Sequence, residues 1–197
     1  MAILRGLLAA ALLMPAAQAQ QAPLLDAPAC PIVYSIYRLK GAPEFTAGFG
    51  QRAHPMATSD LMFWVRTPKR VYWFEFQSPN GYGGTWITPS VRPQLHDAED
   101  KREDGEPPQA IKDWKESSAA AAEANDPLQD ITFDAFKPDL ESFASPPQSS
   151  DAAPARIFMR GLGQALWYSA TWAAAGDRTA EQESVPTAMW EPAGCAR

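Results

Sequence analysis

Cysteine and histidine are scarce in this sequence, and their scarcity excludes several kinds of protein. Of the 197 residues, two are cysteine and two are histidine. Two cysteines are too few for a disulfide-dense miniprotein or for a cysteine-based zinc domain. The sequence contains no His-Glu-x-x-His, Cys-x-x-Cys or calcium-loop pattern, so we expect no metal site.

Basic clusters and long apolar runs are also missing. The formal net charge is −6 and no basic arm or stripe is present, which argues against a nucleic-acid partner. Beyond residue 14 no apolar run approaches the roughly 20 residues of a membrane-spanning helix, so we expect no transmembrane segment in the mature chain. The hydrophobic content of 46% is nevertheless too high for a disordered chain.

Residues 1–19 are typical of a secretory signal peptide. A short basic start that ends at Arg5 precedes an apolar run at residues 6–14, and Ala17 and Ala19 are the small residues that signal peptidase requires. An uncleaved anchor is the alternative, but the run is too short to cross about 30 Å of hydrocarbon. The sequence therefore predicts export to the periplasm or the extracellular medium, with residues 20–197 as a single β-rich domain.

The two cysteines lie near the two ends of that domain. In an oxidising compartment Cys30 and Cys195 have only each other as intramolecular partners, which predicts a disulfide. Two free thiols in the core are the alternative. A disulfide would require the ends of the domain to meet.

Acidic residues are concentrated in the middle of the chain. Residues 97–154 contain fifteen acidic and only five basic side chains. Residues 97–108, which end in two prolines, are expected to form a solvated loop, and residues 145–154 a second one.

Two segments alternate between apolar and polar residues with the period of a β-strand. Residues 61–67 and 71–77 are separated by a short connection, which predicts a hairpin. Pairing Thr67 with Arg70 sets Trp64 opposite Trp73 on one face and places six apolar residues on the other: Leu61, Phe63, Val65, Tyr72, Phe74 and Phe76.

The remaining segments complete a mainly β prediction. Further strands are expected at 32–39, 85–88, 131–135, 156–162, 165–170 and around 188–190, and one helix at 111–124. The fold class predicted is an antiparallel sandwich or partly open barrel of about seven strands, with one short helix and long acidic loops.

Catalytic and cofactor motifs are weak. There is no Gly-x-Ser-x-Gly elbow. Residues 48–53 match Gly-x-Gly-x-x-Ala, but Pro55 interrupts the helix that should follow, so we interpret them as a loop and expect no cofactor. His54, with Ser59 and Asp60 close in sequence, is a weak catalytic candidate; a loop histidine that caps a turn is the alternative. His96 and the acids after it could hold a cation, although such a run is more often a solvated face.

The aromatic residues are the remaining signal. Most of the seven Trp, five Tyr and nine Phe should form the core. Trp64 and Trp73 share the opposite face with Glu75, where they could bind a sugar or an apolar peptide if that face is open. The favoured alternative is that a second layer covers them, because exposed aromatic patches are uncommon.

The first hypothesis for function is a non-catalytic exported domain that binds a ligand or an envelope protein. The alternatives are an exported hydrolase with a site near His54 and Asp60, and a structural envelope component. The sequence does not decide whether the protein is an enzyme, although the lack of catalytic motifs favours a binding protein.

Overall fold

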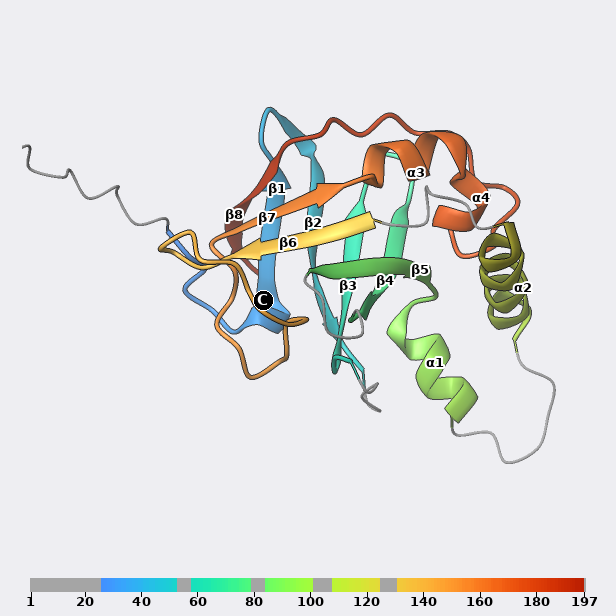
Figure 1. Ribbon diagram of the computed structural model, residues 1–197, viewed down its shortest axis with the longest axis horizontal. Helices are drawn as coiled ribbons and strands as arrows, with labels where there is room; N and C mark the ends of the chain where they lie inside the picture. The colour runs from blue at the N-terminus through green and yellow to red at the C-terminus, as the bar shows by residue number, and fades with distance from the viewer. Residues whose placement is uncertain (1–25, 53–57, 79–83, 101–107, 125–130, 197) are drawn as a thin grey trace, which may run out of the picture.

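The computed structural model describes residues 26–52, 58–78, 84–100, 108–124 and 131–196 (Figure 1). Its centre is a closed barrel of eight strands, each antiparallel to the next along the chain, and the last strand pairs with the first. The strands are β1 (Ser35–Leu39), β2 (Ala42–Gln51), β3 (Leu61–Arg66), β4 (Val71–Gln77), β5 (Thr85–Ser90), β6 (Ile131–Phe136), β7 (Arg156–Arg160) and β8 (Met189–Cys195).

The mainly β, antiparallel prediction is confirmed, but the barrel is closed and has eight strands instead of about seven. The strand missed by sequence reasoning is β2, whose residues 48–51 were interpreted as a loop. Pro43, Gly48 and Gly50 are poor strand formers, yet Phe45, Ala47 and Phe49 alternate toward the core. Pairing on both sides, with β1 and β3, overrides that low local propensity.

The predicted register of the β3–β4 hairpin is confirmed. Phe63 pairs with Phe74, Val65 with Tyr72 and Trp64 with Trp73. Inside the barrel, the rings of Phe49, Phe63, Phe76 and Phe133 pack with centroids 5.0–6.4 Å apart. Eight strands enclose a space just wide enough for side chains, and these rings occupy it.

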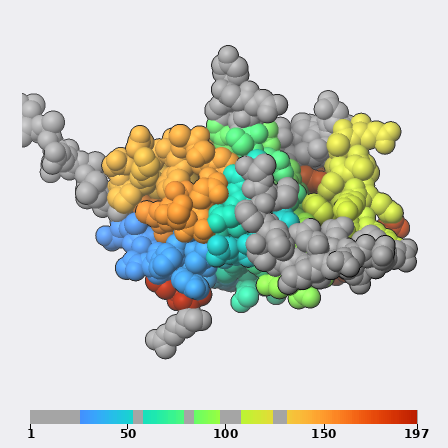
Figure 2. Space-filling view, turned by 90° about the horizontal axis from the view of Figure 1, so that it is seen from below, coloured from blue at the N-terminus to red at the C-terminus, as the bar shows by residue number. Residues whose placement is uncertain are grey.

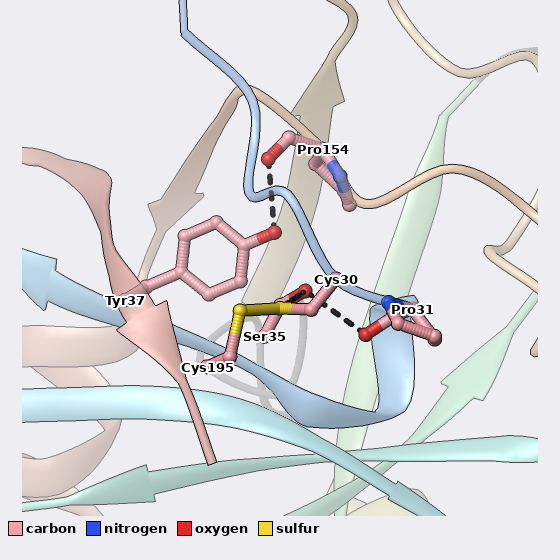
Figure 3. The surroundings of a disulfide bond; sticks show 6 residues. All are labelled: Cys30, Pro31, Ser35, Tyr37, Pro154 and Cys195. Carbon is pink, nitrogen blue, oxygen red and sulfur yellow. Dashed lines mark hydrogen bonds between the residues drawn. A yellow bond between two sulfur atoms is a disulfide. The ribbon is translucent and has the colours of Figure 1, made fainter. Parts of the chain in front are cut away.

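One end of the barrel, which we call the disulfide end, is closed by extended chain. Cys30 and Cys195 form the predicted disulfide, with their Cα atoms 6.2 Å apart, beside the pairing of Ser35 with Cys195 that closes β1 on β8 (Figure 3). Residues 137–155 lie at this end, at the left of Figure 1, and contain no helix. The hydroxyl of Tyr37, inside the barrel, donates to the carbonyl of Pro154 at 2.9 Å.

The opposite end, which we call the helix end, carries the helices. These are α1 (Pro93–Asp100), α2 (Gln109–Ala124), α3 (Leu162–Tyr168) and α4 (Ala170–Ala173); a 3-10 turn (Ile32–Tyr34) precedes β1 at the disulfide end. The predicted helix at 111–124 is confirmed by α2, but the structure has more helices than the one that was predicted. Figure 2 shows α2, in yellow-green, at the far end of the molecule from the orange loop of residues 137–155.

Two further sequence predictions are wrong at the helix end. Residues 165–168 belong to α3 and Ala170 begins α4 instead of forming a strand, because Leu162, Ala165 and Leu166 have helical spacing and cover the barrel core. Residues 97–100 belong to α1 instead of to a loop.

Within the described ranges, no helix is long and apolar enough to cross a membrane.

Candidate functional site

Trp64 and Trp73, the two tryptophans predicted as binding residues, lie on the outside of the barrel against glycines of β2. A Cβ atom added to Gly48 would lie 2.6 Å from the Trp64 ring, and one added to Gly50 would lie 2.8 Å from the Trp73 ring. Only glycine at these positions lets the rings approach the β2 backbone so closely. Both indoles are half-buried, so one face of each ring is used in packing.

The surroundings of the two indoles differ. Trp64 donates from Nε1 to the carbonyl of Phe49 at 3.2 Å, and the guanidinium carbon of Arg66 is 5.7 Å from its ring centroid. Trp73 lies between Gly50 and a cavity at the helix end. Of the pair, Trp73 is therefore the one that lines a space where a ligand could lie.

Glu75, the third predicted binding residue, is buried on the same outer face. Its exposed fraction is 9%, and its Oε2 atom lies 3.8 Å from Nη1 of Arg52, which is itself buried. Among the residues that the structure describes, neither of these atoms has a hydrogen-bond partner. Burial raises the pKa of Glu75 to about 7, because the guanidinium at this distance offsets the loss of solvation only in part.

Of the candidates for hydrolysis, Asp60 lies at the disulfide end, next to Ser59. His54 falls outside the described residues. The carboxylate of Asp60 accepts hydrogen bonds from the backbone and the hydroxyl of Ser149, and the hydroxyl of Ser59 donates to the carbonyl of Pro147. Asp60 and Ser59 thus tie the start of β3 to the loop of residues 137–155.

His96 attaches α1 to the barrel. Its Nε2 atom is 2.8 Å from the hydroxyl of Ser90, and its buried ring meets the Trp114 ring edge-on at 4.8 Å. Trp114 of α2 donates from Nε1 to the carbonyl of Pro89. The histidine proposed as a cation ligand therefore takes part in the junction of α1, α2 and β5. Among the residues that the structure describes, no group of three metal-ligating side chains is found.

The largest cavity described lies at the helix end and has a volume of about 1220 Å³. Its walls come from the β3–β4 hairpin, from α1 and α2, and from the turn that follows α4. A small separate core of Val91, Ile111 and Ala175 joins these elements. Gly176 adopts a positive φ of 88°, and an added Cβ there would lie 2.2 Å from the carbonyl oxygen of Asp113. This close approach fixes the turn against α2.

Charged side chains surround this cavity. The four arginines that line it are Arg66, Arg70, Arg92 and Arg178, and the three acids are Asp113, Glu116 and Asp177. Arg70 donates to Asp177 at 2.9 Å and to the carbonyl of Thr179, and hydrogen bonds from Thr179 and Arg70 lower the pKa of Asp177. The other three arginines have no ion pair within the described chain.

Comparison with known proteins adds no further assignment: no protein family model, no curated protein and no solved structure matches this chain.

Sequence reasoning identified Trp73 but missed the rest of the cavity. Arg66 ends β3, Arg92 follows β5 and Arg178 follows α4, so the three are far apart along the chain. No local pattern links them; strand pairing through β4 brings the first two together, and tertiary packing adds the turn after α4.

Proposed function

We propose that the protein is an exported, non-catalytic binding protein that holds a short acidic peptide segment of a partner in the cavity at the helix end. The observation that carries this proposal is the large cavity lined by Trp73 and by three arginines that form no ion pair with the described residues. The disulfide supports export, because disulfides persist in oxidising compartments.

The barrel interior is a poor alternative for the binding site. Barrels of this size can hold one small ligand when their interior is open. Here Phe133 packs edge-on against Phe49, Phe63 and Phe76, and all four rings are buried. A ligand inside would have to displace these rings, which favours a site outside the barrel.

The size and charge of the cavity favour a peptide over a small anion. Its volume exceeds the roughly 300–1,000 Å³ of sites for drug-sized ligands. Arg66, Arg92 and Arg178 come from three separate segments, so they can meet acidic groups spaced along an extended chain. Arginine pairs with carboxylates in bidentate geometry, which fixes the register of such a chain. Trp73 and Leu95 offer apolar contacts between the charges.

The proposal can be tested by fluorescence anisotropy with a labelled decapeptide of alternating glutamate and leucine. We expect saturable binding that weakens with salt, and a loss of about tenfold or more in affinity for the triple variant Arg66→Ala, Arg92→Ala, Arg178→Ala. The matched control removes three exposed cations elsewhere on the barrel: Arg38→Ala, Lys40→Ala, Arg160→Ala.

Three results would contradict the proposal. They are equal loss of affinity in both triple variants, binding of citrate with the same arginine dependence and no binding of the peptide, and no binding at all. The first would indicate a general charge effect, and the second a small anion as the ligand.

A further inference from the structure

A second groove lies on a different part of the helix end. It has a volume of about 300 Å³ and runs between α3 and residues 184–187. Trp167 and Tyr168 line it and are 43% and 70% exposed. Neither side chain takes part in the acidic-peptide site proposed above, so this groove requires its own explanation.

Trp167 and Tyr168 point to solvent because of their positions on α3. Leu162, Ala165 and Leu166 form the buried face of this helix and pack on the barrel core. Gln164, Trp167 and Tyr168 are three and four residues apart, so they share the opposite face. Two adjacent exposed rings form an apolar patch, and such patches mark interaction sites or ligand-binding grooves.

The other wall of the groove is held firmly against α3. The backbone N–H of Glu183 donates to the carbonyl of Leu166 at 3.1 Å, and the side chain of Val185 is buried in the core cluster. A Cβ atom added to Gly163 would lie 2.5 Å from the carbonyl oxygen of Val185, so the two backbones are in direct contact. A wall fixed in this way needs little ordering when a ligand binds.

The chemistry of the lining is aromatic, polar and uncharged. Beside the two rings, the polar side chains that line the groove are Gln164, Ser184 and Thr187, and no lining residue among those described carries a formal charge. An apolar peptide would leave these polar groups unpaired, and an ionic ligand would find no counter-charge.

From this combination we infer that the groove is a binding site for a neutral carbohydrate, one or two pyranose rings with equatorial hydroxyls. The C–H face of such a sugar packs on an aromatic ring, while its hydroxyls bond to the amide of Gln164 and to the hydroxyls of Ser184 and Thr187. The volume of the groove lies at the lower end of ligand sites and suits a ligand of that size.

The test is isothermal titration calorimetry of the oxidised protein with cellotetraose and, separately, with tetra-N-acetylchitotetraose. We expect saturable binding of at least one of them. Trp167→Ala and Tyr168→Ala should each weaken that binding about tenfold or more, and Gln164→Ala should weaken it as well. The matched control is Tyr34→Ala, which removes an exposed ring at the disulfide end and should leave the affinity unchanged.

Absence of binding for both sugars overturns the inference, and so does binding that all three groove variants retain. Thermal midpoints equal to that of the parent protein establish that the variants are folded. Binding of the acidic decapeptide should be the same in Trp167→Ala as in the parent protein. The carbohydrate proposal and the acidic-peptide proposal can therefore be contradicted independently of each other.

Discussion

At each end of the barrel a buried tyrosine donates a hydrogen bond to a segment outside the barrel, but the acceptor groups differ. At the disulfide end Tyr37 donates to a backbone carbonyl, that of Pro154. At the helix end Tyr72 donates to the carboxylate of Glu183 at 2.6 Å, and Glu183 is itself buried. The tyrosine at the first end therefore bonds to a neutral acceptor, beside a covalent link, and the tyrosine at the second end bonds to a carboxylate.

The two ends also differ in the space they leave around the barrel. At the disulfide end, the loop of residues 137–155 is bonded to β3 through Asp60 and Ser59. At the helix end, α1, α2 and the turn after α4 line the arginine-lined cavity, and α3 with residues 184–187 lines the aromatic groove. Both proposed binding sites therefore lie at the helix end, while the disulfide end is closed by bonded chain and by the Cys30–Cys195 link.

The largest expected effect concerns the disulfide. Replacing both cysteines, as Cys30→Ser with Cys195→Ser, should lower the free energy of unfolding by about 4 kcal/mol, because the unfolded chain is no longer closed into a loop with a sequence separation of 165. Urea unfolding of the variant and the oxidised parent measures the difference. If the decapeptide affinity of the folded variant fell as well, the placement of the binding sites at the helix end alone would be wrong.

The next effect concerns Glu75, which lies on β4 close to the disulfide end. Its pKa in the folded protein is about 7, above its usual 4.5, so the folded state binds the proton more tightly than the unfolded state. The resulting stability is fully present below about pH 4.5 and is lost as pH rises through 7, by about 3 kcal/mol in total.

Denaturant midpoints between pH 5 and 8 provide the measurement for Glu75. The parent protein should lose stability across this range, and Glu75→Gln should have a flatter profile. Glu44→Gln, at an exposed position of β2, is the matched control and should leave the profile unchanged. An identical slope in Glu75→Gln and the parent would show that another group is responsible.

The two tyrosines test the comparison directly. Tyr72→Phe should lower the free energy of unfolding by about 2 kcal/mol, since the buried Glu183 loses the hydrogen bond from the tyrosine hydroxyl. Tyr37→Phe should lower the free energy of unfolding by about 1 kcal/mol, because the hydrogen bond that is lost runs to a neutral carbonyl. Urea unfolding measures both losses. Equal losses in the free energy of unfolding would show that a charged acceptor and a neutral acceptor contribute the same stability here.

The smallest effect concerns the ion pair of Arg70 with Asp177 at the edge of the cavity. Both side chains are partly exposed, so Arg70→Met should cost less than about 1 kcal/mol. Lys69→Met, which breaks the neighbouring exposed pair with Glu181, is the control and should cost no more. A loss of several kcal/mol in Arg70→Met alone would mean that this contact holds the helix end together.

Local patterns predicted part of the fold well. The alternation in β3 and β4 fixed their register in advance, since only one pairing places Phe63 and Phe74 on the same face. The pairing of Cys30 with Cys195 followed from having a single possible partner. Both predictions rest on residues whose chemistry leaves few choices.

Other features depend on contacts between distant segments and could not be predicted locally. The segment around Trp167 is rich in aromatic residues, which favours a strand, but packing on the barrel core makes it a helix. Closure of the barrel depends on β8 returning to β1. Of the candidate site, only Trp73 was identified, because the arginines around it are united by tertiary packing alone.

The disulfide at the barrel seam has a consequence for proteolysis. Cys30 and Cys195 join the start and the end of the described chain, so the polypeptide between them forms a covalent ring. Cleavage of one peptide bond within the ring opens it but releases no fragment, and every strand keeps its neighbours. A protease that cuts a surface loop once would therefore produce a nicked protein of unchanged mass apart from one added water, and two fragments would separate only after reduction and unfolding.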